Sequence, residues 1–166
     1  MPPDLARDPL EEIDRILDER ACVLRELAER TAQAQAERRS FIDGFADRCE
    51  NEVRPLMEEV VTRLRKNGGG GLVHYQPDRG PARMTPRLTL WMSLQGEISG
   101  SPRQDRHPYF QLDADIETRR VKVSTGDMWE GRGSHHSGPV GVWELTALTA
   151  EAVIKEVLTV LRRAAS

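Results

Sequence analysis

The chain has 166 residues, 38% of them hydrophobic and 31% charged, which suits one domain or a small domain with a helical appendage. Its 27 acidic and 24 basic residues give a formal charge of −3, without the positive excess of nucleic-acid or membrane-surface binders. Neither a run of about 18 apolar residues nor an apolar signal segment occurs, so we expect a soluble, cytoplasmic protein. The two cysteines, Cys22 and Cys49, predict neither a zinc knuckle nor a disulfide framework.

Four consecutive glycines at positions 68–71 divide the chain by composition. Residues 1–67 hold 16 acids and 12 bases with one glycine, whereas residues 68–166 hold 11 acids and 12 bases with the other 12 glycines. Turn-forming residues are therefore concentrated in the second part. We predict a helical, coiled-coil-like arm over 1–67, a glycine joint at 68–71 and an α+β head domain over 72–166.

Helix signals stand at both ends of the arm. Asp8 is a suitable N-cap, Pro9 fits the first helical position, and Asn67-Gly68 is a typical C-terminal stop. Between these ends, apolar residues recur every three or four positions, which is the period of an amphipathic helix. The stripe comprises Leu10, Ile13, Leu17, Leu24, Leu27, Phe41, Phe45, Cys49, Val53, Leu56, Val60 and Leu64.

The sequence leaves two arrangements open for this arm, a kinked single helix or a helical hairpin. Residues 31–40 lack large apolar side chains, as a hairpin tip would, yet they include strong helix formers and neither Gly nor Pro. Pro55 predicts a kink in either case, because it removes a backbone hydrogen bond. A thin helix cannot bury its own stripe, so we expect it to pack on a second copy or another protein. The predicted interface residues are Leu17, Leu24, Leu27, Phe41, Phe45, Val53, Leu56 and Val60.

For the head, the sequence predicts a small, mainly antiparallel five-stranded sheet with one C-terminal packing helix. Strand patterns occur at 72–76, 87–94 and 140–145, and residues 109–125 read as a hairpin. Pairing Glu117 with Arg120 and Asp115 with Lys122 in that hairpin aligns opposite charges on one face and apolar residues on the other. Thr149 is a suitable N-cap for the final helix, which we expect to cover one face of the sheet.

The long connection at 126–139 is the candidate binding loop, because loops of this length on small domains are often functional. The residues that we assign to binding there are Trp129, Arg132, His135 and His136. Trp129 is expected to pack back onto the core. Adjacent histidines on an extended chain point to opposite sides, so we expect no metal site and no cofactor. The acids Asp113, Asp115 and Glu117 share one strand face, which we interpret as a solvated surface. No catalytic residue is assigned.

These observations favour a non-enzymatic interaction, assembly or adaptor protein that associates through its helical arm, as a homo-oligomer (a dimer) or with another protein, and not with a membrane. One alternative is nucleic-acid or nucleotide binding by the arginines and aromatic residues of the head. A less favoured alternative is a hydrolase that uses Asp113, Asp115 or the loop histidines His135 and His136.

Overall fold

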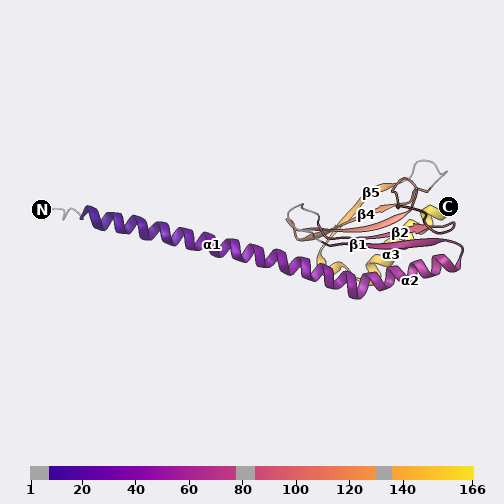
Figure 1. Ribbon diagram of the computed structural model, residues 1–166, viewed down its shortest axis with the longest axis horizontal. Helices are drawn as coiled ribbons and strands as arrows, with labels where there is room; N and C mark the ends of the chain where they lie inside the picture. Colours follow the sequence, from indigo (N-terminus) through magenta and orange to yellow (C-terminus); the bar gives the residue numbers. More distant parts are fainter. Residues whose placement is uncertain (1–7, 78–84, 130–135) are drawn as a thin grey trace. The chain divides into compact units, whose positions relative to one another are not determined.

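The computed structural model describes residues 8–77, 85–129 and 136–166. Three α-helices and five strands make up most of this part of the chain, and they confirm the predicted α+β class (Figure 1). The helices are α1 (Pro9–Arg48), α2 (Arg54–Lys66) and α3 (Ala150–Ala165), with a π-helical turn at Cys49–Val53 and a 3₁₀ turn at Leu145–Ala147. The strands are β1 (Gly70–Gln76), β2 (Arg87–Ser93), β3 (Tyr109–Asp115), β4 (Arg120–Gly126) and β5 (Ser137–Trp143).

Both predicted helix starts are confirmed by their caps. The carboxylate of Asp8 accepts the backbone N–H of Leu10 at 3.0 Å at the start of α1. The hydroxyl of Thr149 accepts the backbone N–H of Ala152 at 3.2 Å at the start of α3. Residues 31–40 are helical throughout. The kinked single helix is therefore confirmed, and the hairpin alternative for the arm is wrong.

The chain divides into two units, one ending at Arg39 and the other beginning at Ser40. This boundary differs from the predicted one at residues 68–71, because the helical residues from Phe41 onward belong to the hydrophobic core of the second unit. Only the first part of the glycine run connects α2 to β1, because Gly70 and Gly71 are the first two residues of β1. Gly68 has a φ of +84° and ends the helix, whereas a Cβ on Gly71 would lie 2.7 Å from the carbonyl oxygen of Trp91.

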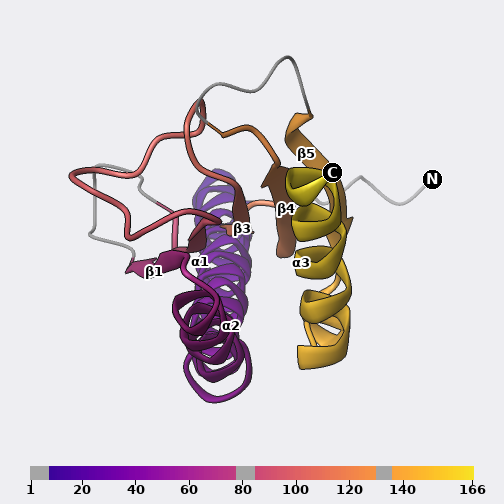
Figure 2. The ribbon, with the colours of Figure 1, turned by 90° about the vertical axis from the view of Figure 1, so that its right-hand side faces the viewer.

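In the second unit, one antiparallel sheet with strand order β1-β2-β3-β4-β5 carries α2 and α3 on the same face (Figure 2). The strands alternate between that face and the other one. The helix-covered face holds Leu88, Leu90 and Met92 of β2, Phe110, Leu112 and Ala114 of β3, and Val121 and Val123 of β4, all fully buried. Val153, Val157 and Val160 of α3 complete the same core.

The helix that crosses the sheet has an unusual period. Its core residues are Phe41, Phe45, Cys49, Val53, Met57 and Val61, each four positions after the previous one. An ideal α-helix turns by about 100° per residue, so a strict spacing of four rotates the stripe by about 40° at each step. The π-helical turn takes an extra residue and reverses part of this drift, which keeps the stripe on the sheet. Pro55 follows directly, and the helix bends at this turn (Figure 1).

The hairpin of β3 and β4 forms where predicted, but its register differs by two residues. Asp115 pairs with Arg120 and Asp113 pairs with Lys122, whereas the charge pattern had placed Glu117 opposite Arg120 and Asp115 opposite Lys122. A shift of two residues leaves every side chain on its predicted face, so the alternation could not detect it. The turn decides the register. The Asp115 carboxylate accepts the backbone N–H of Glu117 at 3.1 Å and closes a four-residue turn over 116–119.

Candidate functional site

The most exposed apolar surface of the first unit lies along one face of α1. Its seven large side chains are 51–67% exposed, although Leu, Ile and Val side chains in folded proteins usually bury most of their surface. They recur in α1 at the spacing of one helix face. We call this surface the α1 stripe: Leu10, Ile13, Ile16, Leu17, Val23, Leu24 and Leu27.

The α1 stripe follows a heptad pattern over two and a half repeats. Leu10, Leu17 and Leu24 take one core position (a) of the heptad, and Ile13 and Leu27 take the other (d). Arg20 occupies the remaining d position. Ile16 and Val23 fall one residue before an a position and widen the stripe on one side. Neither Ile16 nor Val23 was among the predicted interface residues, although both adjoin heptad core positions.

The flanks of α1 are occupied by charged residues that bind each other within the helix. The guanidinium of Arg15 lies 3.3 Å from a carboxylate oxygen of Glu19 and also forms an ion pair with Glu12. The hydrogen bond that the Arg15 guanidinium donates to Glu12, followed by the charge of Glu19, raises the pKa of Arg15 above its ordinary value. All three residues lie away from the heptad core positions, so this network leaves the stripe accessible.

The structure places the remaining predicted interface residues inside the second unit. Phe45 and Val53 are fully buried, Phe41 and Val60 are 6% and 8% exposed, and Leu56 packs partly buried against the same core. These side chains hold the helix on the sheet, so only Leu17, Leu24 and Leu27 of the predicted interface remain on the surface. The single periodic stripe of the sequence is thus divided into an exposed part in the first unit and a buried part in the second.

Of the predicted loop residues, Trp129 packs back onto its own domain. Its indole N–H donates to the carbonyl oxygen of Ala164 at 3.0 Å, near the end of α3. His136 is exposed, and its carbonyl oxygen accepts the backbone N–H of the buried Asp127 at 3.1 Å. Arg132 and His135 lie outside the described residues, so their proposed binding role keeps the status of a prediction.

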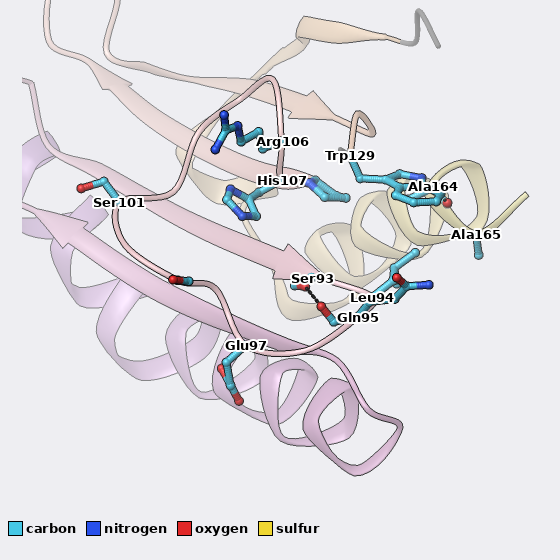
Figure 3. A pocket seen from close by; sticks show the side chains of 12 residues that line it. Ser93, Leu94, Gln95, Glu97, Ser101, Arg106, His107, Trp129, Ala164 and Ala165 are labelled. Atoms are coloured by element: carbon cyan, nitrogen blue, oxygen red, sulfur yellow. Dashed lines mark hydrogen bonds between the residues drawn. The ribbon is translucent and has the colours of Figure 1, made fainter. Parts of the chain in front are cut away.

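A pocket of about 850 Å³ opens beside Trp129, between the end of α3 and the connection from β2 to β3 (Figure 3). Arg106 and His107 line it, and neither was among the predicted site residues. The Nδ1 atom of His107 accepts the backbone N–H of Arg103 at 3.0 Å, which fixes the ring. Glu97 also lines the pocket, and its carboxylate forms an ion pair with Arg65, with 2.6 Å between Oε1 of Glu97 and Nε of Arg65. Both contacts are of a kind that orders a loop.

The two acids proposed for a hydrolase, Asp113 and Asp115, form ion pairs with residues of neighbouring strands. The carboxylate of Asp113 lies 2.5 Å from the Arg87 guanidinium and accepts the side-chain amide of Gln111 at 2.9 Å. Asp115 forms an ion pair with Lys122 at 3.3 Å. Burial alone would raise the pKa of Asp115, but hydrogen bonds from Thr118 and Lys122 lower it below its ordinary value. Such pairing is typical of a sheet surface. Glu117, which was predicted on the same strand face, lies instead in the turn after β3.

Within residues 8–77, 85–129 and 136–166, no three His, Cys, Asp or Glu side chains are grouped closely enough to hold a metal ion. In the same ranges, no helix combines the length and the apolar character that spanning a bilayer requires. The accessible feature with the clearest chemical meaning is therefore the α1 stripe. No family model matches this chain, and no curated protein or solved structure matches it either.

Proposed function

We propose that this protein is a non-enzymatic assembly protein that self-associates through the α1 stripe. One observation carries the proposal: seven large aliphatic side chains on one face of a helix are each more than half exposed. Helices in proteins gain most of their stability from packing an apolar face against another surface, not from intrinsic helix propensity. A second helix laid along the stripe satisfies that requirement.

The expected gain is sufficient for association. Full burial of a Leu, Ile or Val side chain contributes about 1.5–3 kcal/mol, and about half of each stripe side chain is still exposed to water. Each side chain therefore adds about 1 kcal/mol when a partner helix covers it. A pair of helices buries fourteen such side chains, which together contribute about 14 kcal/mol. This free energy exceeds all but the upper end of the ~4–15 kcal/mol that association costs.

The molar mass in solution tests the proposal. We expect the wild-type protein, at tens of micromolar, to sediment as a dimer or a larger assembly of the 18.7-kDa chain. Replacing Leu17 and Leu24 together by Ser removes two core positions of the heptad and should yield monomers. The matched control replaces Asp18 and Arg25 by Ser, each one position further along the same helix, and leaves the net charge unchanged.

The control variant should keep the wild-type mass, because its two positions lie outside the stripe. Circular dichroism at equal concentration shows that each variant still contains its helices and its sheet. A wild-type protein that sediments as a single chain would overturn self-association. A Leu17/Leu24 variant that keeps the wild-type mass would show that another surface makes the contact.

A further inference from the structure

We infer that the occupant of the α1 stripe is the same segment of a second copy, running antiparallel, with Leu10 of one chain against Leu27 of the other. The inference rests on the proposed function and adds the orientation and the register of the pair. The distribution of charge along residues 8–30 and the position of Arg20 favour the antiparallel orientation, and the spacing of the stripe sets the register.

The charge of this segment is strongly uneven. Residues 8–19 hold six acids and one base, a net charge of −5, whereas residues 20–30 hold two acids and three bases, a net charge of +1. A parallel pair in register would place the two −5 segments side by side. An antiparallel pair places each −5 segment beside a +1 segment, which removes most of this repulsion.

The spacing of the stripe is the same when read from either end. The heptad core positions are 10, 13, 17, 20, 24 and 27, so the successive intervals are 3, 4, 3, 4 and 3. With Leu10 opposite Leu27, Ile13 falls opposite Leu24, and each a position meets a d position, as antiparallel helix pairs require. A shift by one heptad in either direction would leave stripe residues of each chain without an apolar partner.

Arg20 distinguishes the two orientations most directly. In a parallel pair, the two Arg20 side chains would meet in the same layer of the seam, where two cations repel each other. In the antiparallel register, Arg20 of one chain faces Leu17 of the other. Asp14 of that second chain lies three residues from Leu17, about 4.5 Å along the helix axis, within reach of the Arg20 guanidinium.

Cross-linking of single cysteines tests the orientation. The background variant carries Cys22→Ser, because Cys22 is exposed and would react, whereas Cys49 is buried. Leu10→Cys and Leu27→Cys are prepared separately, mixed, allowed to exchange subunits and treated with a short bis-maleimide. We expect a cross-linked dimer in the mixture and none in either variant alone, since positions 10 and 10 of an antiparallel pair lie about 25 Å apart.

A mixture of Leu10→Cys with Asp18→Cys is the matched control, and it should not cross-link, because residue 18 lies outside the seam. Cross-linking of either single variant with itself, at the level expected in the mixture, would establish a parallel pair and overturn the inference while leaving self-association intact. Sedimentation of the untreated variants at the mass of a dimer shows that the substitutions spare the pair. A monomeric wild-type protein would instead overturn the proposed function itself.

Discussion

Two residues of α1 separated by six turns should respond in opposite ways to the same substitution. Phe45 is fully buried in the core of the second unit, whereas Leu24 is 54% exposed on the α1 stripe. Phe45→Ala removes a buried aromatic ring and leaves a cavity, which costs about 3–5 kcal/mol of unfolding free energy. Leu24→Ala, at an exposed helix position, should change the unfolding free energy of the second unit by less than about 0.5 kcal/mol.

Tryptophan fluorescence during urea unfolding measures the difference, because Trp91, Trp129 and Trp143 all lie in the second unit. For a unit of this size, the loss of about 3–5 kcal/mol at Phe45 corresponds to a melting temperature lower by about 11–19 °C. The measurement is made at one fixed protein concentration, since association contributes to apparent stability. Sedimentation of the same samples should show the reverse order: Leu24→Ala weakens association, and Phe45→Ala, where it stays folded, does not.

Equal destabilisation of the second unit by Leu24→Ala and Phe45→Ala would contradict this prediction. Residues 10–27 would then belong to the core of that unit, and no surface would be left for a partner. A loss of less than about 1 kcal/mol on Phe45→Ala would also contradict it, because a fully buried ring in a close-packed core cannot be removed at so little cost.

Three further substitutions or modifications test the fold. Thr149→Ala should lower the unfolding free energy by about 0.5–2 kcal/mol in urea titrations, because the N-cap hydrogen bond of α3 is lost; Thr149→Ser should restore it. Gly71→Ala should prevent a stable fold, visible by circular dichroism, because the new Cβ would lie 2.7 Å from the carbonyl oxygen of Trp91. A thiol reagent at pH 8 should modify Cys22 alone in the native protein and both cysteines in denaturant, because burial raises the pKa of Cys49 to about 12.

Local signals in the sequence were sufficient for most of the secondary structure. The capping residues Asp8 and Thr149 fixed two helix starts, and alternation of apolar and polar residues located the strands. The hairpin register was not predictable from charge pairing. Pairing Asp115 with Arg120 or with Lys122 satisfies the same faces, and only the turn closed by the Asp115 carboxylate separates the two.

The division of the helical stripe into an exposed and a buried part was harder to predict, because periodicity alone does not say what a face packs against. The signal was nevertheless present in the spacing. Residues 10–27 follow alternating intervals of three and four, which suits a helix partner, whereas Phe41 to Val61 follow strict intervals of four. The contact of Trp129 with Ala164 spans 35 positions and depends on the tertiary fold, so no local pattern announces it.

The π-helical turn before Pro55 determines which residues face the sheet along the whole buried part of the helix. Since the intervals of four demand the surplus residue, Pro55→Ala by itself should leave the wide turn in place. Deleting the exposed Asn51 in the Pro55→Ala background would convert the intervals to 4, 4, 3, 4 and 4, which an uninterrupted α-helix accommodates. The π-helical turn therefore accommodates one extra residue. A chain shortened by that residue should keep the same core residues on the sheet with a regular α-helix.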